Sequence, residues 1–585
     1  MASLELSPLP VTPHRPEAAP AREPWHRRHR VPLIATGSVL PLYAWWAAAL
    51  ATGGGDLAAQ EAWAGFVARH PGAVYNLSWH GGLHTGSYSL ISPYVMAVFG
   101  VVPVTLASGL ASTWLVGRIC ARCGVARAPW PAVLAALMLW CQAASGRTTF
   151  LLGVAFGLAA VRALVSGRRG AVTAGWALPA TMASPVAGLF LAIVGTACLL
   201  TSCRTERTTA TPTAAAALLV PPVAVLGLTA WLFPFHGLQP MGLVRIWPPL
   251  LMAVCVALAA PRSWPLPRST AAVYAAAVAL AYLIPSPVGT NVERLAHLAA
   301  PPVLLAAAMA GRVHAYAADG ARPWVARARR TSLVLGLVLA VAWVGGNTAA
   351  HVMDTAQVPR WAAETGGVVR ALERLGADRS RVEVTMARSH REAAVLAPYV
   401  TLARGWNRQA DVERGPLFYD GYEGAGVPGG TFTAEAYRAW LDHWAVGFVV
   451  LHDGPLDAAS EREEALVTSE PAYLEPVWRD RHWRVYRVKD PVALVDPPAS
   501  VVRSDAAEVV VRMPVPGTVT LRLAYSPWLR AEGTDAGGDG DGGGDGGGRE
   551  CLAPAPGGLT RLTVSRPGEV TVGSAYRLGA RRCAG

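Results

Sequence analysis

Five acidic side chains lie between residues 31 and 350, and three of them are candidates for chemistry. Asp56, Glu61 and Glu293 fall beside apolar runs, on what the arginine pattern described below predicts to be the outer face of a membrane. Because charged groups are costly in or near the hydrocarbon layer, each is a candidate functional residue. An ionised carboxylate in such a place can act as a general base.

The same predicted face carries imidazoles, tyrosines and isolated arginines. The imidazoles and tyrosines gather in a first loop at residues 53–89, and the arginines follow in later loops. Guanidinium groups bind phosphate through paired hydrogen bonds. We therefore predict a substrate-binding set that consists of His84, Tyr88, Arg147, Arg245, Glu293 and Arg294.

These residues also have structural interpretations. Asp56 could cap a helix over residues 57–69, because Asp is a favoured N-cap residue. His80 and His84 have the i, i+4 spacing of metal ligands, but two glycines between them disfavour a helix, so a divalent metal is unsupported. Arg294 could simply anchor its helix at the interface. We assign no metal site and no cofactor.

The elements that would position these residues are membrane-spanning helices. The chain has 585 residues, 52% hydrophobic and 15% charged, which excludes a single soluble domain. From residue 31 onward it shows apolar segments of about 15–22 residues, the length that crosses a hydrocarbon layer of about 30 Å. Pro93, Gly100 and Pro103 could divide the second segment into a short interfacial helix and a spanning one. We predict about eleven segments, at 31–52, 90–117, 130–145, 148–165, 171–184, 185–201, 212–233, 241–261, 269–285, 297–311 and 332–350.

Arginines give the predicted orientation, because loops rich in Lys or Arg resist translocation. Alternating the segments places 20 arginines of the first 350 residues on the side of the N-terminus and four on the other side, namely Arg69, Arg147, Arg245 and Arg294. Residues 1–30 are therefore predicted to be a cytoplasmic tail, residues 31–350 a multi-pass domain of the plasma membrane, and residues 351–585 extracytoplasmic. A signal peptide cleaved near residues 49–51 is the competing interpretation, but the apolar run before it is longer than an h-region.

The last 235 residues differ from the rest in charge and in pattern. They carry 27 basic side chains against 31 acidic ones, whereas the first 350 residues carry 24 arginines against 8 acids. Residues 351–495 read as a mixed α/β domain, with strands near 382–384 and 446–451 and a hairpin over 474–488. Residues 496–585 read as a β-sandwich-like domain with a Gly/Asp-rich loop at 535–548. No nucleic-acid-binding stripe or motif is present, so we predict no nucleic-acid partner.

Cysteine usage agrees with this layout. Cys551 and Cys583 are the only cysteines of the predicted external part, and an oxidising exterior favours a disulfide between them. Cys120 and Cys123 form a CxxC pair without a second pair, so we interpret them as incidental thiols rather than a zinc site.

The first loop and its flanks resemble a known family. A first span, an acidic residue in a long first external loop, and the sequence HTGSYSLISPY over residues 84–94 entering the next apolar segment are similar to the GT-C class of polytopic glycosyltransferases. The resemblance implies a sugar carried on a polyprenyl phosphate in the membrane lipid, and its transfer at the outer face to a glycan or protein acceptor of the cell envelope. The Arg- and Ala-rich composition, with Lys489 as the single lysine, suggests a high-GC bacterium and thus a member of actinobacterial type.

The resemblance also implies roles for particular residues. Asp56 would be the catalytic carboxylate, with Glu61 as the second acid of the loop, and Arg294 and Arg147 would face the lipid phosphate. Two other classes of protein remain open from the residues alone. A transporter would suit about eleven spans, although we find no half-to-half repeat, and a non-catalytic scaffold for envelope assembly would need Asp56 only as a cap.

Overall fold

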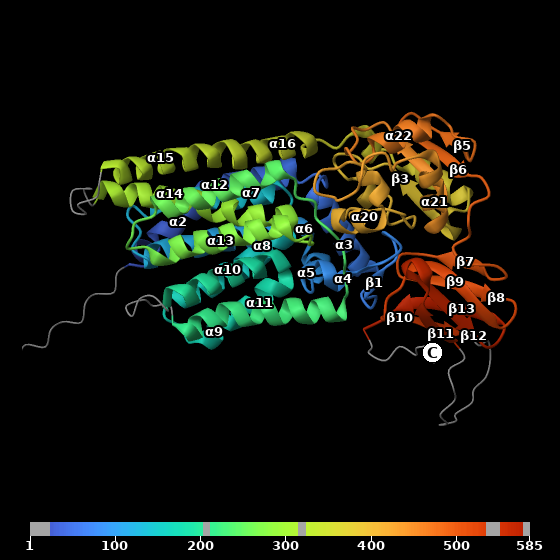
Figure 1. Ribbon diagram of the computed structural model, residues 1–585, viewed down its shortest axis with the longest axis horizontal. Helices are drawn as coiled ribbons and strands as arrows, with labels where there is room; N and C mark the ends of the chain where they lie inside the picture. The colour runs from blue at the N-terminus through green and yellow to red at the C-terminus, as the bar shows by residue number, and fades with distance from the viewer. Residues whose placement is uncertain (1–23, 203–210, 314–322, 534–549, 577–585) are drawn as a thin grey trace, which may run out of the picture.

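The computed structural model describes residues 24–202, 211–313, 323–533 and 550–576, with the side chains of 311–313 and 323 left out. A long bundle of helices forms one part of the molecule, and two parts that contain β-sheet adjoin one end of it (Figure 1). The Gly/Asp-rich loop predicted at 535–548 and most of the predicted cytoplasmic tail lie outside the described residues.

The bundle has a helix at each of the eleven predicted segments. Within the described residues, eight helices are long and apolar enough to span a membrane: Arg30–Leu50, Val101–Arg122, Thr148–Val165, Pro185–Ser202, Pro212–Leu232, Pro265–Leu283, Gly289–Ala310 and Trp324–Thr355. They contain, in chain order, α2 (Arg30–Trp45) with η1 (Trp46–Leu50), α6 (Val101–Arg122), α8 (Thr148–Val165), α10 (Pro185–Ser202), α11 (Pro212–Leu232), α13 (Pro265–Leu283), η2 (Gly289–Val292) with α14 (Glu293–Val313), and α15 (Pro323–Ala340), η4 (Val341–Gly345) and α16 (Gly346–Thr355).

Three further helices of the bundle are shorter. α7 (Pro129–Ala144) and α12 (Leu243–Ala259) are apolar but have fewer than 18 residues, and α9 (Gly170–Ala183) has 14 residues. At 1.5 Å per residue, α9 is about 21 Å long, which is less than the hydrocarbon thickness of about 30 Å. The structure therefore supports a helical domain with eight candidate spans, and the count of eleven stays a prediction.

The predicted first loop is folded rather than irregular. It contains α3 (Asp56–Arg69), the short paired strands β1 (Tyr75–Asn76) and β2 (Leu83–His84), and α4 (Thr85–Tyr88). α5 (Ser92–Phe99) follows and ends at Gly100, whose φ of 84° breaks the helix before α6 begins. This break confirms the division of the second apolar segment that Pro93, Gly100 and Pro103 suggested.

The α/β domain is built around a four-stranded sheet in the order β3-β4-β6-β5. β3 (Arg381–Val384) and β4 (Val446–His452) are parallel, and β5 (Leu474–Arg479) and β6 (Trp483–Val488) form the predicted antiparallel hairpin. Residues of α3, including Trp63 and Phe66, belong to the same hydrophobic core as Val382 and Val450. The first loop is therefore part of the packing of this domain. Its helices include α18 (Gly366–Arg374), α19 (Glu392–Val395), α20 (Arg408–Arg414), α21 (Ala434–His443) and α22 (Glu461–Thr468).

The C-terminal domain has two antiparallel sheets around one core, as the sequence predicted. One sheet has the order β10-β13-β8-β7 and the other β11-β12-β9. Inward residues of both sheets, such as Val511 and Leu521, share a core that also contains Tyr75 and Leu77 of the first loop. The strands are β7 (Ser500–Ser504), β8 (Glu508–Met513), β9 (Gly517–Ala524), β10 (Leu529–Gly533), β11 (Glu550–Pro554), β12 (Leu559–Val564) and β13 (Gly568–Ser574).

Hydrogen bonds fix the sandwich to the bundle and to the first loop. The Trp528 indole donates to the carbonyl of Leu232 at the end of α11, at 2.6 Å. The backbone N–H of Tyr75 donates to Ser574 Oγ at 3.0 Å. Because residues 53–89 contact the bundle and both β-containing domains, their conformation depends on all three.

Candidate functional site

Asp56 lies where the first candidate span gives way to α3. Gly55, with a φ of 63°, is the N-cap residue, and Asp56 is the first residue inside the helix. The predicted helix is thus present, but the interpretation of Asp56 as its N-cap is wrong. The Asp56 carboxylate instead lies near two guanidinium groups of the bundle.

Arg147 and Arg294 hold the Asp56 carboxylate from two different helices. Asp56 Oδ2 is 3.5 Å from Arg147 Nε and 4.0 Å from Arg294 Nη2. Arg147 is the N-cap residue of α8, where Nη1 also donates to Gln142 Oε1 at 2.8 Å. Arg294 is the second residue of α14 and lies over the ring of Phe150, with 5.3 Å from Cζ to the ring centroid. Residues 56, 147 and 294, which the sequence predicted as one site, therefore meet.

A cavity of about 250 Å³ opens beside these arginines. Its walls come from the same end of α7, α8, α12, α14 and α16, the end that faces the α/β domain (Figure 1). The lining is almost wholly polar and consists of Ser145, Arg147, Arg245, Thr290, Asn291, Glu293, Arg294, His297, Asn347 and His351. The volume is below the range of about 300–1,000 Å³ for drug-sized ligands, so the cavity suits a small polar group.

A second ion pair crosses the cavity. Arg245 Nη1 is 3.9 Å from Glu293 Oε2, and the Arg245 side chain is 57% exposed whereas that of Glu293 is 7% exposed. We call Asp56, Arg147, Arg245, Glu293 and Arg294 the cavity cluster: the last four line the cavity, and Asp56 adjoins it through its pairs with Arg147 and Arg294. Three positive and two negative groups leave it with a net positive charge, which favours an anionic ligand.

Several buried polar atoms of the cavity have no hydrogen-bond partner among the described residues. They are Glu293 Oε1, His297 Nε2 and Arg147 Nε, although the last of these takes part in the ion pair with Asp56. Buried polar groups almost always have a hydrogen-bond partner. These three atoms could therefore bind a water molecule or a polar ligand. The cavity therefore has both the charge and the free hydrogen-bonding capacity of a binding site.

Tyr88 supports the site from behind α3. Gln60, one turn after Asp56, donates to the Tyr88 hydroxyl and accepts from Thr149 Oγ1 at 2.5 Å. The Tyr88 ring stacks on Trp63, with 5.7 Å between ring centroids. Tyr88 was predicted as a ligand contact, but it does not line the cavity and instead joins α3 to α8.

Glu61 and His84, two other predicted site residues, lie away from the cavity. Glu61 faces the α/β domain, where burial raises its pKa and the charge of Arg391 opposes that shift. His84 Nε2 lies 2.8 Å from Ser526 Oγ, in the contact with the sandwich. Burial, together with the charge of Arg414, lowers the pKa of His84 to about 3. The structure therefore places neither Glu61 nor His84 in one site with Asp56.

Sequence reasoning missed part of the cavity wall. His351 and Ser145 line it, but they lie beyond or at the ends of predicted apolar segments, and Asn347 lies inside the last one, three residues before its predicted end. The last helix runs to Thr355, five residues past the predicted end of its segment. Extending that segment by one helical turn would have brought His351 onto the same predicted face as Glu293.

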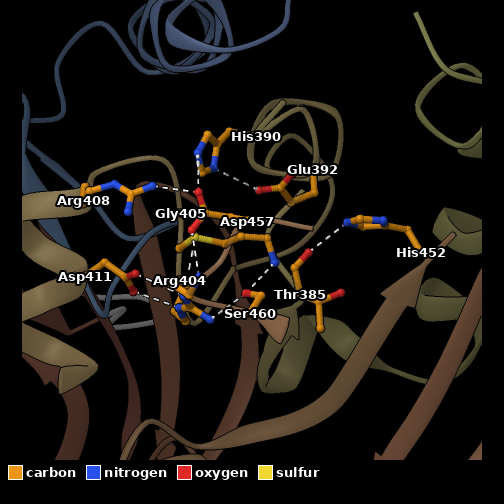
Figure 2. Close-up of polar contacts among 12 residues, drawn as sticks. Thr385, His390, Glu392, Arg404, Gly405, Arg408, Asp411, His452, Asp457 and Ser460 are labelled. Atoms are coloured by element: carbon orange, nitrogen blue, oxygen red, sulfur yellow. Dashed lines mark hydrogen bonds and ion pairs between the residues drawn. The ribbon is translucent and has the colours of Figure 1, made fainter. Parts of the chain in front are cut away.

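The α/β domain holds a second group of arginine and carboxylates, which is fully buried. Arg404 Nε is 2.8 Å from Asp411 Oδ1, and Arg404 Nη1 is 2.9 Å from Glu463 Oε2 and 3.4 Å from Glu383 Oε1. Figure 2 shows Arg404 between Asp411 and Ser460. We call Glu383, Arg404, Asp411 and Glu463 the domain cluster. Burial and the neighbouring Glu463 charge raise the pKa of Glu383 well above its ordinary value.

Two predictions about metals and thiols can be compared with the structure. Among the described residues, no group of three or more His, Cys, Asp or Glu side chains has the arrangement of a metal site. Cys551 in β11 is disulfide-bonded, whereas Cys583, its predicted partner, lies outside the described residues. The pairing of these two cysteines therefore stays a prediction.

The comparison with protein families concerns the C-terminal part of the chain. Residues 496–584, which include the whole sandwich, match a domain of unknown function (DUF8823). No curated protein matches the chain. The bundle, the cavity and the α/β domain lie outside the matched residues.

Proposed function

We propose that the protein is an integral membrane glycosyltransferase that transfers a sugar from a polyprenyl-phosphate carrier to an envelope acceptor. The observation that carries this proposal is the position of Asp56 between Arg147 and Arg294, at the edge of a cavity lined by three arginines. A carboxylate beside an anion site is what the reaction needs, because a base and a clamp on the leaving phosphate must lie close together.

The chain's own groups account for the charge changes of such a step. An acceptor hydroxyl attacks the anomeric carbon of the sugar and gives its proton to Asp56, as the new C–O bond forms. The bond between the anomeric carbon and the phosphate oxygen breaks, and the polyprenyl phosphate leaves with the electron pair. Arg147, Arg245 and Arg294 would stabilise the negative charge on that oxygen.

The loose ion pairs of the cavity suit this exchange. Distances of 3.5 and 4.0 Å from Asp56 are longer than those of a strong charge-assisted hydrogen bond, about 2.7–2.9 Å. A phosphate that entered the cavity would compete for Arg147 and Arg294 and would leave Asp56 free to accept a proton. In the ligand-free protein the carboxylate partly neutralises the two guanidinium groups.

We also propose that the cavity opens on the extracytoplasmic side of the plasma membrane. The cavity lies at the end of the bundle beside the α/β domain, and Arg162, Arg168, Arg262 and Arg268 lie at or near the other ends of their helices. Loops rich in arginine stay in the cytoplasm. A reporter that is active only outside the cytoplasm should be active after residue 576 and silent after residue 262, and the reverse result would overturn this orientation.

The test of the enzyme is Asp56→Asn in purified protein reconstituted with polyprenyl-phosphate esters of radiolabelled hexoses and pentoses. Loss of the base should lower the transfer rate by at least about 10²-fold. The melting temperature should stay near that of the wild type, because Asp56 does not cap its helix. Asp354→Asn is the matched control, since Asp354 lies at the same end of the bundle and pairs with Arg388 at 3.9 Å outside the cavity. Full activity of Asp56→Asn would overturn the catalytic role and favour a transporter or a scaffold.

A further inference from the structure

Residues 52–55 join the first candidate span to Asp56, and three of the four are glycines. Gly53 has a φ of 74° and Gly55 a φ of 63°. Glycine is the residue that loses the most conformational freedom on folding, so this segment does not hold one conformation by itself. Contacts from other parts of the chain must therefore fix the position of Asp56.

Arg391, just before α19 of the α/β domain, makes several of these contacts. Its Nη2 donates to Thr52 Oγ1 at 2.7 Å and to the carbonyls of Thr355 and Gln357 at 2.9 and 3.1 Å. Its Nη1 donates to the carbonyl of Thr52. One guanidinium, on a residue only 3% exposed, thus joins the ends of the first and last candidate spans.

The neighbours of Arg391 add to this arrangement. The backbone N–H of Gly55 donates to the carbonyl of Ser389 at 2.6 Å. The Thr52 hydroxyl also donates to the carbonyl of Thr355. Residues 389–391 therefore hold both sides of the glycine segment, one residue before Asp56 and four residues before it.

The glycines are required by what packs against them. A Cβ at Gly54 would lie 2.8 Å from Arg391 Nη2, and a Cβ at Gly53 would lie 2.6 Å from Glu61 Oε2. A Cβ at Gly55 would clash with the imidazole of His351. Glu61 therefore lies on the side of the glycine segment away from the cavity lining, where its charge and that of Arg391 shift each other's pKa.

We propose that Arg391, with Glu61 beside it, is a positioning residue that fixes residues 52–55 and so holds Asp56 between Arg147 and Arg294. The α/β domain then does more than cover the bundle, because it sets the geometry of the site. The catalytic consequence rests on the proposed function, whereas the contact itself can be tested without it.

The chain offers a matched control three residues away. Arg388 Nη1 lies 3.9 Å from Asp354 Oδ1 and also joins the α/β domain to the last helix, but both side chains are largely exposed, at 59% and 44%. Arg388 makes none of the contacts with residues 52–55 described above. Arg388→Gln therefore loosens the same domain contact without releasing Asp56.

The first arm of the test is hydrogen–deuterium exchange of the purified full-length protein. Arg391→Gln should speed the exchange of peptides that cover residues 51–60, and Arg388→Gln should leave them at the wild-type rate. Gly54→Ala is a second variant, because its backbone is not in the left-handed region and the added methyl would displace Arg391. Wild-type exchange in both Arg391→Gln and Gly54→Ala would overturn the contact, and equal exchange in Arg391→Gln and Arg388→Gln would overturn its specificity.

The second arm measures sugar transfer with the labelled carriers used for Asp56→Asn. A misplacement of about 1 Å can cost about 10²-fold in rate, so we expect Arg391→Gln to lower kcat by at least about 10-fold. The KM for the carrier should change by less than about 2-fold, because the arginines of the cavity remain. Faster exchange with an unchanged kcat, in a protein that Asp56→Asn inactivates, would overturn the positioning role alone. Full activity of Asp56→Asn would instead overturn the proposed function and leave the exchange result standing.

Discussion

The cavity cluster and the domain cluster both combine arginine with carboxylates, but their side chains are packed differently. In the domain cluster, Arg404 lies 2.8–3.4 Å from its carboxylates, and each of these side chains is at most 2% exposed. In the cavity cluster the corresponding distances are 3.5–4.0 Å, and the side chains are 7–57% exposed. The two clusters are built from the same residue types, but they differ in the ratio of arginines to carboxylates, in the closeness of the pairs and in access to solvent.

This difference is what we expect between a structural cluster and the binding site that we propose. Arg404 also stacks on Phe418, with 3.7 Å from Cζ to the ring centroid, so its planar face is used as well as its N–H groups. Removing water from charges is costly unless they are paired and hydrogen-bonded, and here one arginine serves three carboxylates, so Glu383 Oε2 has no hydrogen-bond partner among the described residues and the pKa of Glu383 is raised. The unpaired atoms of the cavity cluster instead lie on residues that line a cavity, where a ligand could use them.

The largest expected effect is on stability, and it should separate Arg404 from Arg294. Arg404→Gln leaves three buried carboxylates without their counter-charge, which should cost at least about 3–5 kcal/mol and abolish the folded α/β domain. Arg294→Gln removes one of three partly exposed arginines, so its melting temperature should stay near the wild type. Thermal unfolding followed by intrinsic fluorescence, in detergent, measures both variants.

A binding measurement should separate Arg294 from an arginine that lies outside the cavity. Arg294→Gln should weaken the binding of undecaprenyl phosphate in detergent micelles, whereas a variant of the exposed pair, Arg388→Gln, should bind as the wild type does. An Arg294→Gln protein that loses as much stability as Arg404→Gln would make the cavity cluster structural. The two clusters would then not differ in role.

The sequence pointed to one cluster and not to the other for a physical reason. Asp56, Glu293 and Arg294 stand beside apolar runs, where any ionisable group is conspicuous. Glu383 and Arg404 lie in a part of the chain with many charges, and only the fold shows that they are buried. The strands near these residues could be predicted, because a run of apolar residues indicates a buried strand.

Other parts of the candidate site needed more than pattern. Glu61 follows Asp56 by five residues, and at about 100° per residue this places it about 140° around α3, a separation that the sequence already contained. His84 lies against Ser526, 442 residues later in the chain, and no local signal reports such a contact. Arg391 was missed because its role depends on where two helices end.

The second prediction concerns pH and the domain cluster. Burial, with the charge of Glu463, raises the pKa of Glu383 well above its value of 4.5 in an unfolded chain. Between that value and the raised pKa of the folded state, the folded protein binds more protons than the unfolded one, so stability falls as pH rises, by about 1.4 kcal/mol per pH unit for one proton. Glu383→Gln has no proton to lose and should flatten this decline between pH 7 and pH 9. Melting temperatures over that range measure the slope.

The titration of His80 provides a control for Glu383→Gln at lower pH. His80, which lies near Asp411, has its pKa lowered to about 4 by burial. Its neutral form is favoured in the folded state, so it contributes a loss of stability as pH falls below about 6.5, which Glu383→Gln should leave in place. Equal slopes of the wild type and Glu383→Gln above pH 7 would contradict a proton held in the domain cluster.

The smallest expected effect is that of Glu61→Gln, which tests whether Glu61 belongs with the catalytic carboxylate or with Arg391. Gln keeps the shape that packs against Gly53 and removes the charge. Partial burial raises the pKa of Glu61, but the residue remains exposed to solvent, which screens its attraction to Arg391. We therefore expect stability to change by less than about 1 kcal/mol. Sugar transfer should stay within about 3-fold of the wild type, far from the effect of about 10²-fold expected for Asp56→Asn.

A loss of activity in Glu61→Gln as large as that of Asp56→Asn, with normal exchange of residues 51–60, would mean that Glu61 acts in the chemistry after all. Two carboxylates on opposite sides of α3 would then serve one reaction, and the cavity cluster would have to extend to the α/β domain.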